Sequence, residues 1–147
     1  ALRPDFKDYI KSVLANAKIL SETLKNNGFK IYSGGTDTHL MLVDLRPFNV
    51  KGNLTAESLS KANITCNKNG IPFDTEKPMI TSGIRLGTQA ATTRGFGLKE
   101  FEKVGELITK VVKGLSENPD DNSKIEEEVR NEVIELTSSF PIYKNFK

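Results

Sequence analysis

Three long segments of this chain carry apolar residues at the three- and four-residue spacing of amphipathic helices, and this spacing limits the fold more than any other feature. The first segment begins at Pro4 and ends at the stop signal Asn26-Asn27-Gly28. Its apolar stripe consists of Phe6, Ile10, Val13, Ala17, Leu20 and Leu24. The stripes of the other two segments consist of Phe101, Val104, Ile108, Val111 and Leu115, and of Ile125, Val129, Val133 and Leu136. These stripes predict helices that each bury one side.

Short strand patterns lie between the first two helical segments, at Phe29–Tyr32, His39–Leu45 and Thr81–Thr88. A Gly-rich turn joins the first two, which favours an antiparallel pair. The sequence therefore predicts an α/β (α+β) sandwich of two layers, in which helices cover a small, mostly antiparallel sheet.

Smaller helical signals complete the expected order of elements. Thr55 has the side chain of a helix N-cap, and the helix after it is expected to reach about Asn63. Residues 89–94 are expected to form one helical turn that ends at Gly95. Ser123 and Glu126 have the spacing of a capping box, which predicts the start of the last helix.

Composition excludes several classes of function. The 147 residues carry a formal charge of +2, and Lys and Arg are scattered among Asp and Glu, so no basic stripe favours nucleic acid. No apolar run is long enough for a membrane span, and no signal peptide is visible. One cysteine, Cys66, suits a reducing compartment, and we expect a cytoplasmic protein with Cys66 in the core. One histidine and one cysteine argue against an all-protein zinc site, so no metal site is predicted.

Arg85 is the candidate binding residue, because it stands between Ile84 and Leu86 in a predicted strand. Side chains alternate along a strand, so Arg85 points away from its two apolar neighbours. Its planar guanidinium suits a carboxylate or a phosphate. Two alternatives stay open: Arg85 is a surface residue or the partner of a structural carboxylate, or Arg94 is the functional arginine.

Two further features carry weaker functional signals. His39 lies at the mouth of the first strand pair, and we favour a structural hydrogen-bonding role over acid–base chemistry. The turn Ser33-Gly34-Gly35-Thr36 lacks the lysine and the following helix of a phosphate-binding P-loop.

Four motifs occur in one order along the chain: Ser33–Leu40 (SGGTDTHL), Ala62–Thr65 (ANIT), Asn67–Asn69 (NKN) and Thr81–Thr88 (TSGIRLGT). Together they closely resemble the C-terminal domain of serine hydroxymethyltransferase. The resemblance covers essentially the whole chain, from the first helix to Tyr143.

The resemblance implies a pyridoxal-phosphate enzyme that interconverts serine and glycine and passes the one-carbon unit to tetrahydrofolate. It implies the small C-terminal domain of fold-type-I pyridoxal-phosphate enzymes over residues 1–147, with the N-terminal cofactor-binding domain absent. By resemblance, Arg85 matches the arginine that holds the amino-acid carboxylate, and Asn69 matches a folate contact. Lys77, Pro78 and Met79 fall where the family lines its folate site, often with Ser-Pro-Phe, so Lys77 and Met79 depart from that pattern.

The same resemblance places the catalytic lysine elsewhere. The family's Schiff-base lysine follows a histidine in a Thr-rich segment, and this chain has no such segment. We therefore expect no catalytic residue here, no pyridoxal 5'-phosphate bound to this chain alone, and no activity without the N-terminal domain. The expected partners are that N-terminal domain and further copies, in a homodimer or homotetramer.

Two other interpretations stay open at this point. The chain could be the small domain of another pyridoxal-phosphate enzyme, such as an aminotransferase. It could also be a stand-alone α/β module that binds a small anion or a partner protein.

Overall fold

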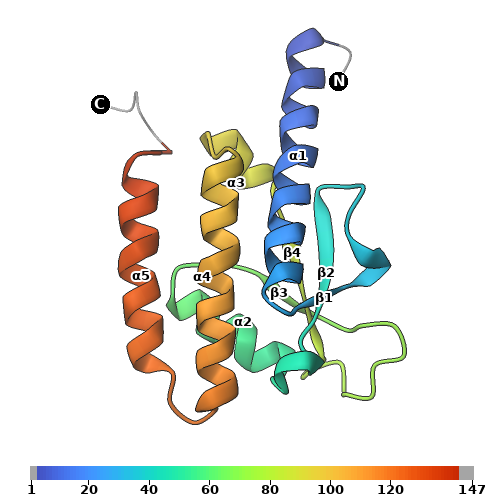
Figure 1. Cartoon of the computed structure of the whole chain (residues 1–147), viewed down its shortest axis with the longest axis vertical. Coiled ribbons are helices and arrows are strands. Elements are labelled where there is room, and N and C mark those ends of the chain that lie inside the picture. Colours follow the sequence, from blue (N-terminus) through green and yellow to red (C-terminus); the bar gives the residue numbers. More distant parts are fainter. Residues whose placement is uncertain (1–2, 143–147) are drawn as a thin grey trace.

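The computed structural model describes residues 3–142, which form a layer of helices packed on a four-stranded sheet (Figure 1). The helices are α1 (Pro4–Asn26), α2 (Gly52–Lys61), α3 (Gln89–Arg94), α4 (Leu98–Glu117) and α5 (Ser123–Ser138), with short 3-10 turns η1 (Tyr32–Gly34) and η2 (Arg46–Phe48). The strands are β1 (Lys30–Ile31), β2 (Leu40–Asp44), β3 (Asn67–Asn69) and β4 (Gly83–Gly87). They lie in the order β1-β2-β4-β3, and each neighbouring pair is antiparallel. The predicted fold class is confirmed.

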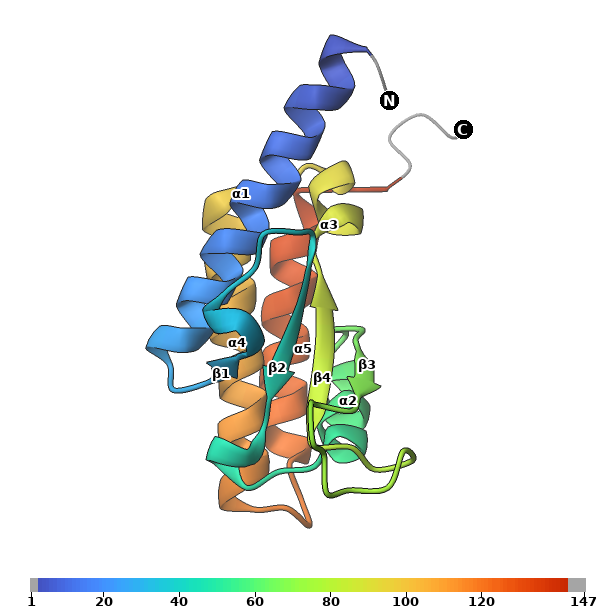
Figure 2. The same ribbon diagram turned by 90° about the vertical axis from the view of Figure 1, so that its right-hand side faces the viewer.

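The sheet has one face in the core and one face turned away from it. Met41 and Val43 of β2 and Ile84 and Leu86 of β4 all belong to the buried core. Because side chains alternate along a strand, the residues between them face the other way. Figure 2 shows the sheet in front of α1, α4 and α5, with no α-helix of the described residues over its near side.

The helical stripes are buried as predicted, with one exception at the start of α1. Later in α1, the stripe residues Val13, Ala17, Leu20 and Leu24 are buried in the core, and the helix packs beside α4. Phe6, Ile10 and Leu14 are between 37% and 40% exposed, because the first half of α1 extends beyond the rest of the domain (Figure 1). The prediction of burial was therefore wrong for Phe6 and Ile10.

One predicted helix start and one predicted capping box were also wrong. Helix α2 begins at Gly52 and not after Thr55, which lies inside the helix, buried and without a side-chain hydrogen bond among the described residues. The N-cap of α5 is Asn122, and its side chain makes no capping bond. Glu126 instead accepts a hydrogen bond from Ser58 Oγ of α2 (2.6 Å), so it ties two helices together.

Strand β3 was not among the strands predicted from the sequence. Its residues, Asn67-Lys68-Asn69, are all polar and have no strand-like alternation. They become a strand because the edge of β4 supplies the partner groups. The final tyrosine of the family resemblance, Tyr143, lies outside the described residues. Within residues 3–142, no helix is long and apolar enough to cross a membrane.

Candidate functional site

Arg85 lies at the centre of the open face of the sheet. Its neighbours across the sheet are Leu42 of β2 and Asn67 of β3, neither of which is charged. The Arg85 side chain is exposed, and it forms no ion pair or hydrogen bond with any other residue of the described chain. The alternative in which a structural carboxylate neutralises Arg85 is thus excluded for the described residues.

Asp44, a carboxylate on the neighbouring strand β2, already has partners of its own. Asp44 is 1% exposed and accepts hydrogen bonds from Arg46 Nε (3.0 Å) and Nη2 (2.6 Å), with Lys30 Nζ at 3.8 Å. Burial acts to raise the pKa of Asp44, but the hydrogen bonds from Arg46 and the charge of Lys30 outweigh it, so the pKa is lowered. Asp44 therefore stays ionised and satisfied without Arg85.

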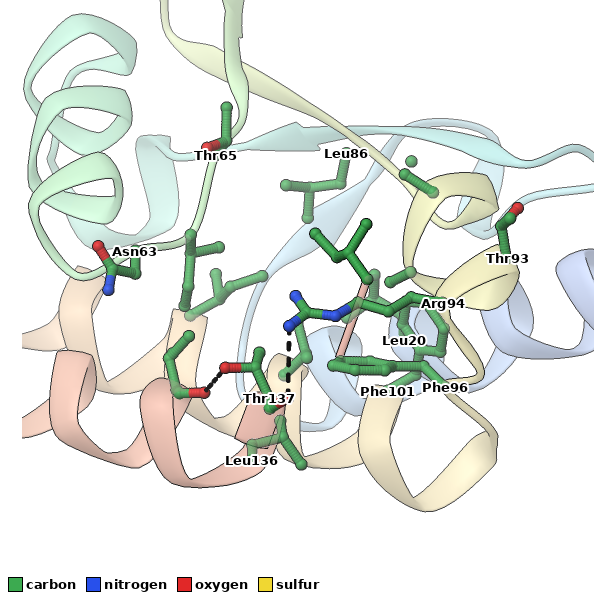
Figure 3. Close-up of a pocket in the computed structure, with 18 of the residues that line it drawn as sticks. Leu20, Asn63, Thr65, Leu86, Thr93, Arg94, Phe96, Phe101, Leu136 and Thr137 are labelled. Atoms are coloured by element: carbon green, nitrogen blue, oxygen red, sulfur yellow. Dashed lines mark hydrogen bonds between the residues drawn. The ribbon is translucent and has the colours of Figure 1, made fainter. Parts of the chain in front are cut away.

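Arg94, the rival arginine, has a structural role. Its Nε donates to the carbonyl oxygen of Phe140, and its Nη2 donates to that of Thr137 (3.3 Å). Both carbonyls lie at the C-terminal end of α5, where backbone oxygens lack helical partners. Figure 3 shows Arg94 reaching toward Thr137. Arg94 caps a helix, and this leaves Arg85 as the candidate anion-binding residue.

Asn69 shares the open face with Arg85. In the register of β3 and β4, Asn67 is opposite Arg85 and Asn69 is opposite Gly83. Asn69 is thus a diagonal neighbour of Arg85, a separation that long side chains can bridge. Asn69 Nδ2 donates to the carbonyl oxygen of Gly70 (2.8 Å), which leaves its amide oxygen available. The structure brings these two predicted site residues together.

The loop of residues 70–82, between β3 and β4, is organised by one carboxylate. Asp74 accepts hydrogen bonds from the backbone N–H groups of Ile71 (3.2 Å), Glu76 (2.9 Å) and Ser82 (2.9 Å), and from Ser82 Oγ (2.7 Å). Burial acts to raise the pKa of Asp74, but these hydrogen bonds stabilise the ionised form and hold the pKa well below its ordinary value. The carboxylate therefore joins the two arms of the loop just before Arg85.

The end of this loop is held against α2 by close backbone packing. Thr81 has a φ of +63°, which is unusual for a β-branched residue, and its Oγ1 donates to the carbonyl oxygen of Gly83 (3.0 Å). The N–H groups of Gly52 and Asn53 donate to the carbonyls of Thr81 and Ile80, both at 2.9 Å. A β-carbon at Gly52 would overlap Thr81 Oγ1 and lie 2.5 Å from the carbonyl oxygen of Gly83. Only glycine fits at position 52.

Lys77, Pro78 and Met79 form the exposed turn that precedes β4. The carbonyl oxygen of Lys77 accepts hydrogen bonds from the N–H groups of Ile80 (2.8 Å) and Thr81 (3.0 Å). Met79 is 73% exposed. These three residues are at the far end of the loop from Asn69, and among residues 3–142 no hydrogen bond links their side chains to Arg85 or Asn69.

Cys66 and His39 carried weaker signals in the sequence, and the structure gives neither side chain a functional role. Cys66 packs against the core, and burial raises the pKa of its thiol to about 11, so it is a poor nucleophile. The predicted hydrogen-bonding role of the His39 side chain finds no partner in the described residues. Instead, the carbonyl oxygen of His39 accepts from the N–H of Thr88 (3.1 Å).

A large, mainly apolar hollow of about 1010 Å³ lies on the opposite side of β4 from Arg85 (Figure 3). Its lining includes Leu86, Phe96, Phe101 and Leu136, all of which belong to the core or pack against it. Since Leu86 and Arg85 alternate along β4, the hollow and the arginine do not share a face.

Comparison with known proteins identifies a family for this chain. Residues 1–108 match the family model described as serine hydroxymethyltransferase. The chain is 94% identical over all of its 147 residues to serine hydroxymethyltransferase of Pelagibacter ubique, and covers 34% of that protein. It is 62% identical over 144 residues to the enzyme of Marinomonas, of which it also covers 34%. It is 61% identical over 143 residues to serine hydroxymethyltransferase 2 of Ralstonia nicotianae, again over 34% of that protein.

The chain belongs to the serine hydroxymethyltransferase family. The predicted resemblance is confirmed, and neither an aminotransferase domain nor a stand-alone module is favoured. The chain spans about a third of the length of the curated relatives that it matches.

Arg85 and Asn69 are candidates that the sequence predicts, and the structural roles of Asp74 and Gly52 are ones that it does not predict. Asp74 accepts a bond from the N–H two residues later, the Asx-turn pattern typical of aspartate in Pro-rich loops, and this pattern could have revealed it. The role of Gly52 depends on Thr81, far along the chain, and no local signal marks it.

We expect Gly52→Ala to lower the free energy of unfolding by about 1–3 kcal/mol or more, because the added methyl group overlaps Thr81 and the backbone of Gly83. Urea unfolding followed by circular dichroism measures this change. Gly70→Ala is the control, because a β-carbon there has an ordinary 3.8 Å contact with Asp74, and its effect should stay within about 0.5 kcal/mol. Equal stability of the two variants would contradict the packing argument.

The lowered pKa of Asp74 predicts a dependence of stability on pH. A carboxylate with a folded-state pKa below its unfolded value stabilises the fold above the unfolded pKa, near 4, and loses this contribution as the pH falls toward the folded value. Between pH 5 and pH 2, roughly, the melting temperature of the wild type should therefore fall more steeply than that of Asp74→Asn. Parallel curves would show that the Asp74 hydrogen bonds do not stabilise the ionised form.

Proposed function

We propose that this chain is the C-terminal domain of a serine hydroxymethyltransferase, a pyridoxal-phosphate enzyme that interconverts serine and glycine and passes the one-carbon unit to tetrahydrofolate. Its proposed part is to bind the substrate carboxylate and one side of the folate. The observation that carries the proposal is Arg85, exposed at the centre of an uncovered sheet face with no partner among the described residues.

In this proposal Arg85 holds the carboxylate of serine or glycine. A guanidinium can donate two parallel hydrogen bonds to a carboxylate, which fixes both the position and the plane of the acid group. β4 gives this contact a rigid base, because Ile84 and Leu86 are anchored in the core on either side. Fixing the acid end of the substrate orients its reacting carbon atoms and lowers the entropic cost of the reaction.

Asn69, Lys77, Pro78 and Met79 are proposed as the folate side of the site. Asn69 supports this role because it shares a sheet face with Arg85, so one side chain can contact the amino acid and the other the folate. The exposed turn of Lys77, Pro78 and Met79 offers one cation and two apolar surfaces at the rim.

The residues described here do not fit the covalent attachment of pyridoxal phosphate. A lysine that forms a Schiff base needs a desolvated setting that lowers its pKa. The least exposed lysines, Lys103 and Lys110, are ion-paired with Glu132 of α5 at 2.6 Å and 3.0 Å, and the pairing raises the pKa of Lys110. We therefore propose that another part of the enzyme holds the cofactor.

The remaining part of the enzyme is proposed to cover two exposed surfaces of this domain. One is the open sheet face, and the other is the row Phe6, Ile10 and Leu14 on α1. Apolar rows that stay exposed in an isolated domain are typical of contact surfaces. We further propose a homodimer or homotetramer, and action in the cytoplasm, where the single thiol of Cys66 stays reduced.

Activity should require the rest of the enzyme. We expect the chain alone, supplied with serine, pyridoxal 5'-phosphate and tetrahydrofolate, to form no glycine. A hybrid in which this chain replaces the matching segment of the Pelagibacter ubique relative should form glycine, since the two segments are 94% identical. Turnover by the chain alone would refute the division of roles.

In the same hybrid, Arg85→Ala should raise KM for serine by roughly 30-fold or more, because truncation leaves the substrate carboxylate unpaired. Arg85→Lys should recover only part of this loss, because an ammonium cannot form the bidentate pair. The matched control is Arg130→Ala, on α5, where the guanidinium donates to the carbonyl oxygen of Lys61 (2.8 Å) and to no other residue of the described chain. Steady-state kinetics at saturating folate give KM. An unchanged KM for serine in Arg85→Ala would show that Arg85 does not bind the substrate carboxylate.

A further inference from the structure

A second hollow, of about 820 Å³, lies between α1 and the segment of residues 32–39 that joins β1 to β2. Figure 1 shows this segment bowing away from β2 beside α1. β1 pairs only with Val43 and Asp44 of β2, so within the described chain no strand lies beside residues 40–42 on this edge. The hollow thus takes the place that a longer β1 would fill, and the proposed function gives it no role.

One wall of the hollow is a polar row on α1. The row consists of Lys18, Ser21, Glu22 and Lys25, which have the three- and four-residue spacing of one helix face. Ser21 is 2% exposed, and its Oγ has no hydrogen-bond partner among the described residues. Glu22 is half-buried and forms no ion pair with any of them. A buried hydroxyl without a partner is unfavourable, which points to a bound molecule that supplies one.

The Gly-rich turn between β1 and β2 lies against this row. Lys25 Nζ donates to the carbonyl oxygen of Gly34 (2.8 Å), so α1 brings to the turn a lysine that the sequence of the turn lacks. A β-carbon at Gly35 would lie 3.9 Å from Ser21 Oγ and 4.0 Å from Lys25 Nζ. Because Gly35 has no side chain, this point stays open to a ligand oxygen that accepts hydrogen bonds from both groups.

The charges around the hollow favour a ligand that carries both signs. The two ammonium groups, of Lys18 and Lys25, are matched by the carboxylates of Glu22 and of Asp37 in the turn. A simple anion such as phosphate would be attracted by the first pair and repelled by the second. An α-amino acid can pair its carboxylate with an ammonium group and its own ammonium group with a carboxylate.

Another wall of the hollow is apolar. It consists of Leu40, Met41 and Leu42 of β2 and of Pro72. Ligand sites are typically built in this way, with apolar walls and a few polar groups that fix the orientation of the ligand. The apolar wall suits a large hydrocarbon side chain, which serine and glycine lack. The hollow is therefore suited to a different amino acid from the proposed substrates.

We propose that this hollow binds an α-amino acid with a large apolar side chain. Ser21 and Lys25 hold its carboxylate, Glu22 holds its ammonium group, and the apolar wall holds its side chain. The site is separate from the one proposed for the substrate carboxylate, although Leu42 is the cross-strand neighbour of Arg85. The inference goes beyond the proposed function, because none of these contacts belongs to the proposed substrate or folate site.

Isothermal titration calorimetry of the hybrid enzyme with leucine tests the chemistry of the ligand. Leucine should bind. Its analogues 4-methylpentanoate, which lacks the ammonium group, and 3-methylbutylamine, which lacks the carboxylate, should each bind about tenfold more weakly or worse, because each loses charge-assisted hydrogen bonds. Equal binding of leucine and 4-methylpentanoate would make this an anion site only and would overturn the proposal.

Three variants of the hybrid test the position of the site. Glu22→Gln should weaken leucine binding by about tenfold, and Glu117→Gln, at an exposed position of α4, is its control. Gly35→Ala should weaken binding because its methyl group fills the opening, while the fold stays intact, since Gly35 has an extended backbone (φ 168°) and ordinary contacts. Ser21→Ala should weaken binding yet raise the melting temperature of the ligand-free enzyme, because it removes a buried hydroxyl without a partner. Unchanged leucine affinity in all three variants overturns the proposal.

Arg85→Ala in the same hybrid separates this inference from the proposed function. Leucine affinity should be the same in Arg85→Ala as in the wild type. Loss of leucine binding in Arg85→Ala but not in Glu22→Gln would place leucine in the substrate site, which overturns the inference while the proposed function stands. No heat of binding at about 10 mM leucine also overturns it. A hybrid that binds leucine in this way but forms no glycine supports the inference and overturns the proposed function.

Discussion

The register of β4 is the constraint on which the rest of this domain depends. Ile84 and Leu86 are anchored in the core, so Arg85 between them must face outward. A slip of one residue would bury the guanidinium and expose both apolar side chains. Gly83 helps to fix the register, because a β-carbon there would lie 2.6 Å from Ile71 Cγ2 and 2.8 Å from the carbonyl oxygen of Val43. Core packing on one face of the sheet thereby sets the position of Arg85 on the other.

The distribution of charge leaves this one guanidinium available. Asp44, the buried carboxylate on the open face of the sheet, is neutralised by Arg46 and Lys30. Arg94 is used at the end of α5. Each of these groups has a partner of its own, whereas the exposed Arg85 has none among the described residues and is available to an incoming carboxylate.

The sequence allowed prediction of those features that depend on local spacing. The long helices follow from stripes of apolar residues, and the outward direction of Arg85 follows from alternation within one short strand. The start of α2 and the absence of a capping box in α5 could not be predicted, because contacts far along the chain decide them. α2 begins early because the N–H groups of Gly52 and Asn53 donate hydrogen bonds to the loop before β4. The capping box of α5 is absent because the Glu126 carboxylate accepts a hydrogen bond from Ser58 of α2 and not from its own helix end. Strand β3 was not predicted for the same reason, because its polar residues form a strand only by pairing with the edge of β4.

The exposure of Arg85 supports the proposed division of binding and catalysis between two parts of one enzyme. In water, a guanidinium and a carboxylate attract each other weakly, since at 4 Å their interaction is only about 1 kcal/mol. The same pair gains several-fold in strength when a second body covers the site and removes the water. Arg85 is set in place by the sheet but is uncovered on the described surface. Strong substrate binding would therefore arise only when the rest of the enzyme closes over this face, so that the carboxylate is held only where the cofactor is present to act on it.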